Sequence, residues 1–210
     1  MNDELSFISV KSNKLKILII GGGKAGFIKA KSFLNKGACV KVISQEFCSE
    51  FKSLLEYERL SLSSEIYSES LINQCHIVVI ATSDKNLNDT IRNHCEKTYK
   101  IYIDTTEVDK SLCITPTMGE SKNIVFALHT KGKSPKTSVF VRDIMSENLM
   151  KYDDYVEFSL KVRNSIDDMK KKIEVMNFIS TKDFLYFFNK GYGEKILKLF
   201  YGGLSLEDSN

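Results

Sequence analysis

Hydrophobic residues in the first half of the chain alternate between short β-branched runs and stretches with helical spacing. Leu15–Ile20 is such a run and stops at three glycines, after which Lys24–Asn35 carries apolar residues at helical intervals. Further strands are expected at residues 38–43, 60–66, 76–81 and 100–104, with helices at residues 47–57, 68–73 and 86–99. The run His76–Ala81 is continuously apolar, which is typical of a strand in a parallel sheet covered on both faces. The alternation predicts an α/β fold with a doubly wound parallel sheet.

The pattern changes after Asp109. Residues 114–118 and 123–130 are typical of strands in an additional sheet, and Ser134 with Pro135 suits the N-cap and first position of a helix. From Met150 onward the chain is predicted to be helical. We therefore expect three regions: a sheet domain over residues 1–113, a small α+β domain over residues 114–149 and a helical domain over residues 150–210.

The strongest chemical signal lies between the first predicted strand and the first predicted helix. Gly21, Gly23 and Gly26 fit the spacing G-x-G-x-x-G, which Rossmann-type domains use to bind dinucleotides. The first glycine permits the tight bend, the second lets a pyrophosphate approach the backbone, and the third lets helix and strand pack closely. The helix N-terminus adds N–H groups and a favourable dipole. The alternative is an ordinary tight turn, but the strand–turn–helix setting favours a dinucleotide site.

The end of the second predicted strand bears on the choice of dinucleotide. A Rossmann site often has Asp or Glu there to bind the adenosine ribose. Here Ser44 takes that place, with Gln45 beside it and Glu46 slightly later. No arginine is present at this point to bind a 2′-phosphate, although Lys41 is near. NAD is therefore favoured over NADP as the cofactor.

Polar residues also follow the fourth and fifth predicted strands, at the sheet edge where ligands bind in this fold. Thr82, Ser83 and Asp84 follow the fourth strand, and the alternative for the last two is simple capping of the next helix. Asp104 and Glu107 follow the fifth, where carboxylates could transfer protons or coordinate a cation. The alternative for both is a solvated loop carboxylate.

Composition narrows the class of protein. A chain of 210 residues with 42% hydrophobic and 27% charged residues is neither disordered nor fibrous, and a formal net charge of +3 gives no reason to expect nucleic acid as a partner. No secretory signal and no membrane-spanning apolar run are visible. The five cysteines are an odd number without a C-x-x-C pair, so we expect a cytoplasmic protein with reduced thiols. The three histidines are not at zinc-ligand spacing, and no metal site is predicted.

Three segments of the chain match the motifs of one known family. The family pattern G-G-G-x-V-A-x-R-K corresponds to GGGKAGFIK at residues 21–29, and A-T-x-D-x-x-x-N corresponds to ATSDKNLN at residues 81–88. The pattern S-T-x-G-x-S-P, followed by Ile/Val-Arg, corresponds to HTKGKSPKTSVFVR at residues 129–142. The motifs occur in the family's order, and together they resemble the N-terminal module of siroheme synthases, the precorrin-2 dehydrogenase/sirohydrochlorin ferrochelatase family. The length is similar to the stand-alone form rather than to a fusion with a methyltransferase.

The resemblance implies NAD-dependent oxidation of precorrin-2 to sirohydrochlorin, followed in some members by insertion of ferrous iron to give siroheme. It also implies a homodimer built from a Rossmann domain, a small central dimerisation domain and a helical tail. Carried over to this sequence, the residues that contact the dinucleotide are Lys24, Ala25, Gln45, Glu46 and Thr82. The carboxylate-rich tetrapyrrole is expected to bind the segment containing Thr130, Lys131, Lys133, Ser134, Lys136 and Arg142. The alternative for these cations is a solvated basic face.

Two departures from the family pattern bear on activity. The family has N-x-x-D after the fifth strand, with the Asp as the proposed acid/base and chelation residue. Here Asp104 takes the place of the Asn and Glu107 that of the Asp, while Ile28 stands where the glycine motif has Arg. Glu107 and Asp104 are thus the candidate catalytic residues, and proton transfer could fall to either. The alternative to an enzyme is a non-catalytic dinucleotide- or tetrapyrrole-binding module.

Overall fold

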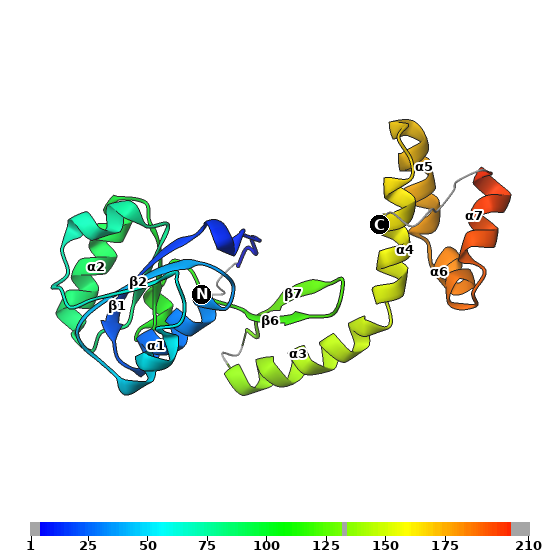
Figure 1. The fold of residues 1–210 in the computed structure, drawn as a ribbon. Coiled ribbons are helices and arrows are strands. Elements are labelled where there is room, and N and C mark those ends of the chain that lie inside the picture. Colours follow the sequence, from blue (N-terminus) through cyan, green and yellow to red (C-terminus); the bar gives the residue numbers. More distant parts are fainter. Residues whose placement is uncertain (1–4, 132–133, 203–210) are drawn as a thin grey trace. The chain divides into compact units, whose positions relative to one another are not determined.

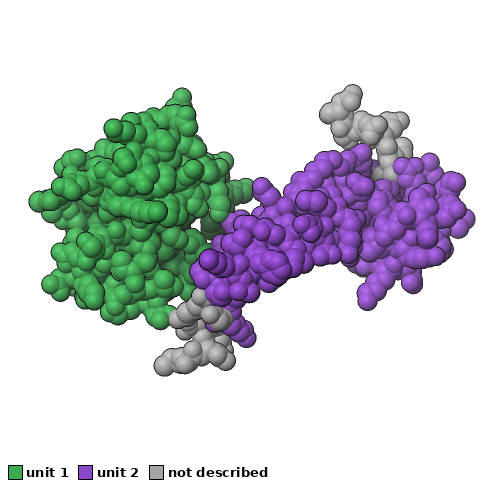
Figure 2. Space-filling view, turned by 90° about the horizontal axis from the view of Figure 1, so that it is seen from below, with its two compact units in different colours: residues 1–115 green, residues 116–210 purple. Residues whose placement is uncertain are grey.

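A computed structural model describes residues 5–131 and 134–202 of the chain. The chain divides into two compact units, residues 1–115 and residues 116–210, which Figure 2 draws in different colours. The first boundary lies two residues beyond the one expected from the sequence. The further division expected at residue 149 stays a prediction.

The first unit is built on a parallel sheet of five strands in the order β3-β2-β1-β4-β5. Figure 1 draws this unit in blue to green. Its strands are β1 (Lys16–Gly22), β2 (Cys39–Phe47), β3 (Leu60–Ser63), β4 (Ile77–Ile80) and β5 (Ile101–Asp104). Helix α1 (Lys24–Leu34) connects β1 to β2, and α2 (Lys85–Lys97) connects β4 to β5. Short 3-10 turns lie at Ser12–Lys14, Ser49–Leu54, Glu69–Gln74 and Val108–Lys110. This strand order confirms the predicted Rossmann-type, doubly wound sheet, in which the chain changes direction between β1 and β4.

Alternation along β1 explains why both faces of the sheet are covered, because successive side chains of a strand point to opposite faces. Ile19 belongs to one buried core together with Ala30 of α1. Its neighbour Ile20 belongs to a second buried core together with Ile91 of α2. Each helix therefore closes one side of the sheet and is fixed next to the strand ends where ligands bind.

The region after β2 differs from the sequence prediction. Residues 47–57 do not form an α-helix, since only Ser49–Leu54 is helical, as a 3-10 turn. Strand β2 instead continues past its expected end at residue 43 to Phe47. It does so because Gly22 pairs with Phe47 after a register shift, and the N–H of Cys48 donates to the carbonyl of Gly22 at 2.8 Å. Backbone pairing overrides the helical spacing here, and residues 44–46 belong to a strand.

The second unit contains an antiparallel hairpin followed by helices. The strands are β6 (Thr117–Glu120), which begins three residues later and ends two residues later than expected, and β7 (Val125–Leu128), which is shorter than expected. The helices are α3 (Pro135–Met150), α4 (Asp153–Asn164), α5 (Met169–Ile179), α6 (Lys182–Asn189) and α7 (Gly193–Tyr201). The hairpin turn is tied to α4 because the carboxylate of Asp153 accepts hydrogen bonds from Ser121 Oγ at 2.8 Å and from the N–H of Asn123 at 2.9 Å. Helices α4 to α7 share a core that includes Val162, Val175 and Phe184. Within the described ranges, no helix is long and apolar enough to cross a membrane.

Candidate functional site

A cavity of about 470 Å³ lies beyond the carboxyl ends of the strands in the first unit. Residues 20–23, 43–45, 65–67 and 81–84 line it, together with Leu87. These segments lie at the end of β1, in the second half of β2 and after β3 and β4. Open α/β sheets bind their ligands at this edge, next to the point where the strand order reverses.

The glycine turn leaves one open approach to this cavity. Gly21 has a φ of 122°, and a Cβ there would overlap the carbonyl oxygen of Ala81. A Cβ on Gly26 would overlap the carbonyl oxygen of Gly21. At Gly23, by contrast, a Cβ would meet nothing within 4 Å, and this residue is the N-cap of α1 without a side chain to cap the helix. The turn therefore fits a pyrophosphate group, which would approach α1 at Gly23.

The cavity brings together about half of the predicted cofactor residues. Those that line it are Gly21, Gly23, Ser44, Gln45 and Thr82. Gly26 packs closely against the carbonyl oxygen of Gly21, and Lys24 and Ala25 are exposed on the first turn of α1. Glu46 is exposed on β2, outside the cavity lining. Contact of Lys24, Ala25 and Glu46 with a dinucleotide stays a prediction.

Three further lining residues, Glu65, Ile66 and Tyr67, were not predicted from the sequence. The sequence pattern placed the first two inside a strand, but β3 ends at Ser63, so they belong to the following loop. Burial raises the pKa of Tyr67 to about 12, which keeps its hydroxyl neutral. That hydroxyl lies 3.1 Å from Nδ1 of His94 on α2.

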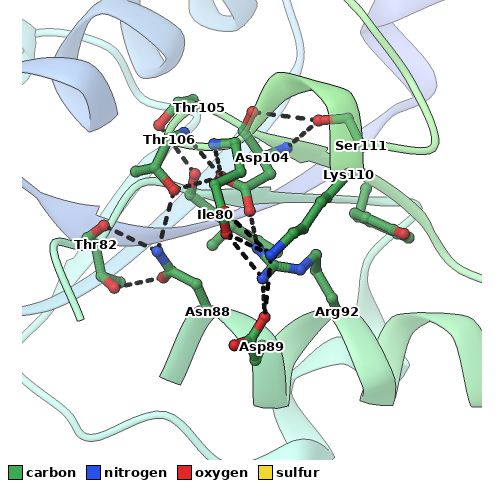
Figure 3. Close-up of polar contacts among 12 residues, drawn as sticks. Ile80, Thr82, Asn88, Asp89, Arg92, Asp104, Thr105, Thr106, Lys110 and Ser111 are labelled. Atoms are coloured by element: carbon green, nitrogen blue, oxygen red, sulfur yellow. Dashed lines mark hydrogen bonds and ion pairs between the residues drawn. The ribbon is translucent and has the colours of Figure 1, made fainter. Parts of the chain in front are cut away.

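Asn88 connects the end of β4 to the loop after β5 (Figure 3). Its side chain is buried on α2, and its Oδ1 accepts a hydrogen bond from Thr82 Oγ1 at 2.5 Å. Its Nδ2 donates to the carbonyl of Thr82 at 3.1 Å and to Thr106 Oγ1 at 3.3 Å. Asn88 therefore fixes a cavity residue, Thr82, and links it to the loop that carries Glu107.

Asp104 is fully buried, and hydrogen-bond donors surround its carboxylate. Oδ1 accepts from the N–H of Thr106 at 2.8 Å, from Thr106 Oγ1 at 2.7 Å and from the N–H of Glu107 at 3.0 Å, while Oδ2 accepts from Arg92. Burial by itself raises the pKa of Asp104, but these donors outweigh it and hold the pKa below its usual value. A carboxylate that is ionised, enclosed and saturated with donors is suited to shaping the loop at residues 105–107, and this favours a positioning role for Asp104.

Glu107 is the more accessible of the two candidate carboxylates, with 36% of its side chain exposed. Its Oε2 lies 3.1 Å from Arg92 Nη2, and its Oε1 lies 3.0 Å from Lys110 Nζ. Arg92 is itself buried and also binds Asp104 and Asp89. Neither Glu107 nor Asp104 lines the cavity, and the loop after Asp104 is linked to the lining residue Thr82 through Asn88.

Arg92 was missed in the sequence, although a signal was present. It follows Asn88 by four residues on α2 and precedes Cys95 by three, so that all three share one face of the helix. Because Cys95 is fully buried in the core, polar residues on the same face are expected to need buried partners. Asn88 and Arg92 find those partners at the ends of β4 and β5.

The predicted substrate residues lie in the second unit, around the start of α3. Thr130 Oγ1 lies 2.8 Å from Ser138 Oγ, which in turn donates to the carbonyl of Ser134 at 3.0 Å. Ser134 is the N-cap by position, as predicted, but its hydroxyl contacts Thr137 Oγ1 at 2.7 Å instead of capping a backbone N–H. These contacts bring Thr130 and Ser134 together at the first turn of α3.

The predicted cations of this segment differ in their surroundings. Lys131 and Lys136 are exposed. Arg142 lies two turns further along α3, where its Nη2 is 2.6 Å from Asp143 Oδ1 and its side chain packs against Gly119 of β6. Lys133 lies outside the described residues. Binding of a substrate to these residues stays a prediction.

Known proteins resemble this chain over most of its length. It is 26% identical over 193 residues to a siroheme synthase of Psychrobacter sp. (strain PRwf-1), covering 91% of this chain and 38% of that protein. It is 30% identical over 129 residues to the siroheme synthase of Buchnera aphidicola, covering 61% of this chain and 27% of that protein. The chain thus spans well under half the length of these siroheme synthases.

A protein of Methanocaldococcus jannaschii that carries the provisional name precorrin-2 dehydrogenase matches more evenly. It is 26% identical over 197 residues, which cover 88% of this chain and 90% of that protein. The solved structure of SirC, a precorrin-2 dehydrogenase, superposes with a TM-score of 0.69 at 18% identity, over 93% of this chain and 98% of that chain. That likeness confirms the fold class.

A family described as NAD(P)-binding matches residues 8–117, which is the unit that holds the glycine turn and the cavity. The match confirms the predicted NAD-type cofactor, and the relatives confirm the resemblance to siroheme synthases and precorrin-2 dehydrogenases. This chain therefore belongs to the NAD(P)-binding family whose pattern its residues 8–117 carry.

Proposed function

We propose that this protein oxidises precorrin-2 to sirohydrochlorin with NAD as the hydride acceptor. The observation that carries the proposal is the match over nine-tenths of a relative named for this activity, together with a cavity at the glycine turn that fits a dinucleotide. In the reaction, precorrin-2 and NAD⁺ give sirohydrochlorin, NADH and one proton. The substrate therefore loses a hydride and a proton, and the protein must orient the first loss and assist the second.

Bound NAD supplies the nicotinamide ring that accepts the hydride. Gly23 and the first turn of α1 are the groups that would hold its pyrophosphate, and Ser44, Gln45 and Thr82 would contact the rest of the dinucleotide. Glu107 is the residue we propose to take the proton, because it is exposed enough to meet a substrate. Asp104, Arg92 and Asn88 support it by holding the loop at residues 105–107.

We propose that the tetrapyrrole binds through its carboxylates to the basic segment at the start of α3. Support comes from the exposed Lys131 and Lys136, and from the way Thr130 and Ser134 are held together beside them. Ferrous iron is the proposed second substrate, entering sirohydrochlorin with release of two protons. The competing function is a binding module without turnover, which the change from N-x-x-D to Asp104 and Glu107 motivates.

The proposed function is tested by anaerobic incubation of the full chain with precorrin-2 and NAD. We expect NADH and sirohydrochlorin to form in equal amounts, followed by a siroheme spectrum when ferrous iron is added. Formation of NADH and sirohydrochlorin without siroheme would support the dehydrogenase activity and refute the proposed iron insertion. Binding of NAD without formation of NADH would refute the dehydrogenase and support the non-catalytic binding module.

A change at Gly23 should separate cofactor binding from folding. Because a Cβ there meets nothing within 4 Å and the residue has an ordinary φ of −78°, Gly23→Ala should keep the melting temperature of the wild type. The added methyl group would keep the pyrophosphate from the N–H groups of α1, and we expect NAD to bind about 10- to 100-fold more weakly in calorimetric titration. The control is Gly26→Ala, whose Cβ overlaps a carbonyl oxygen. Gly26→Ala should lower the melting temperature in addition to the affinity for NAD. Equal melting temperatures of the two variants would contradict this interpretation of the turn.

We also propose that the protein is a homodimer joined through its second unit. Helix α3 leaves Val139, Phe140, Ile144 and Met145 exposed, an apolar surface of the kind that a second subunit would cover. Light scattering should give twice the chain mass of 23.9 kDa. The double variant Phe140→Glu, Ile144→Glu should give a monomer, while Leu160→Glu at an exposed leucine of α4 should stay dimeric. A monomeric wild type would refute the dimer.

Finally, we propose that the protein works in the cytoplasm. All five cysteines are free thiols in the structure, and burial raises the pKa values of Cys75, Cys95 and Cys113. Unpaired, unreactive thiols are usual in a reducing compartment. Fractionation of cells that express the tagged protein would test this.

A further inference from the structure

Glu65 gives this site an acidic side chain from the loop after β3 instead of from the end of the second strand. In many Rossmann domains an Asp or Glu at the end of the second strand binds the adenosine ribose, and here that position is Ser44. Glu65 follows β3, which lies beside β2 with Ile43 paired to Ser63. Glu65 lines the same cavity as Ser44 and Gln45. A carboxylate is therefore present at this part of the cavity although the second strand does not supply it.

Glu65 also forms an ion pair with Lys41, the basic residue of β2. Its Oε1 lies 2.6 Å from Lys41 Nζ, and that oxygen is shielded from solvent although 36% of the side chain is exposed. The contact with Lys41, and after it the Ser63 hydroxyl, lower the pKa of Glu65, so the carboxylate is charged at neutral pH. Lys41 is thus already engaged by an anion and is a poor partner for a phosphate.

We infer that Glu65 is the residue that makes this site select NAD over NADP. Its carboxylate accepts a hydrogen bond from the ribose hydroxyl of NAD and repels the 2′-phosphate that NADP carries at the same place. Its ion pair withholds Lys41, the cation that would otherwise attract that phosphate. The inference rests on the cofactor site of the proposed function and is independent of its tetrapyrrole substrate.

The test is calorimetric titration of the full chain with NAD and with NADP, without any substrate. We expect the wild type to bind NAD at least about tenfold more tightly than NADP, and Glu65→Gln to reduce this ratio about tenfold, mainly by strengthening NADP binding. Glu58→Gln removes the same charge at an exposed position before β3, at the opposite end of that strand from Glu65, and should leave the ratio within about twofold. The melting temperature of each variant checks its fold.

A second measurement uses the wild type alone, so it stands even if Glu65→Gln folds poorly. Because the selection is by charge, raising the salt concentration should reduce the preference for NAD. A ratio unchanged in Glu65→Gln, or unchanged by salt, would overturn the inference, and so would a shift produced by Glu46→Gln instead. A protein that shows the Glu65-dependent preference but turns over no precorrin-2 would refute the proposed enzyme and leave this inference standing.

Discussion

Replacing Glu107 by glutamine is expected to lower kcat for precorrin-2 oxidation by a factor of roughly 100 to 10,000, the range that a general base contributes. Glutamine keeps the size of the side chain and can still accept hydrogen bonds from Arg92 and Lys110, but it cannot take up a proton. Because Glu107 does not line the cavity, NAD should bind with unchanged affinity. Initial rates of NADH formation, with NAD affinity measured separately, provide the test.

Two companion variants sharpen the Glu107 experiment. Glu107→Asp restores the family's residue with one methylene less, and it should recover part of the activity that glutamine loses. Asp109→Asn removes a carboxylate two residues further along the same loop and should leave kcat within about threefold. Full turnover by Glu107→Gln would take Glu107 out of the mechanism, whatever the stability of the variant.

Replacing Arg92 by methionine is expected to lower the free energy of unfolding of the first unit by about 3–5 kcal/mol. The substitution leaves the fully buried Asp104 charged and without its guanidinium partner. Urea unfolding followed by circular dichroism measures the effect. The transition to read is the one that NAD shifts to higher urea, because ligand binding stabilises only the unit that holds the cavity.

The matched control for Arg92 is its exposed partner. Asp89 binds the same guanidinium from a position with 57% of its side chain exposed, so Asp89→Asn should cost less than about 1 kcal/mol. The double variant Arg92→Met, Asp104→Asn removes both buried charges and should lose less stability than the sum of the single variants. Additive losses would show that the two side chains do not act as a pair.

Lowering the pH should reduce the free energy of unfolding of the wild type through the pair of Arg92 and Asp104. Since the folded-state pKa of Asp104 lies below its unfolded value, its contribution to stability is complete above the unfolded pKa of about 3.9 and is lost as the pH falls below that value. In Asp104→Asn this contribution is missing at every pH. The difference in the free energy of unfolding between wild type and variant should therefore shrink as the pH falls from about 5 to about 3.

Local sequence patterns determined the framework of the first unit. The alternation of Ile19 and Ile20 between two cores, and the continuous apolar run of β4, are properties of a few neighbouring residues, so the parallel sheet could be predicted from them. The same holds for the spacing of Gly21, Gly23 and Gly26, because all three lie in one continuous strand–turn–helix segment. The cofactor class followed from this local information.

Contacts between distant segments decided the rest. The pairing of Gly22 with Phe47 extended β2 to the first residue of an expected helix, of which only Ser49–Leu54 is helical, as a 3-10 turn. Strand β3 ended early enough to place Glu65 in the cavity. The sequence left proton transfer open between Asp104 and Glu107, and the structure separates them: Asp104 is buried against Arg92, twelve residues before it, while Glu107 is accessible. By itself the sequence determined the sheet, the glycine turn and the kind of cofactor, because these depend on side-chain spacing along one segment. The tertiary structure decided which of the two carboxylates is buried and which is accessible, because burial and charge pairing exist only once separate segments of the chain meet.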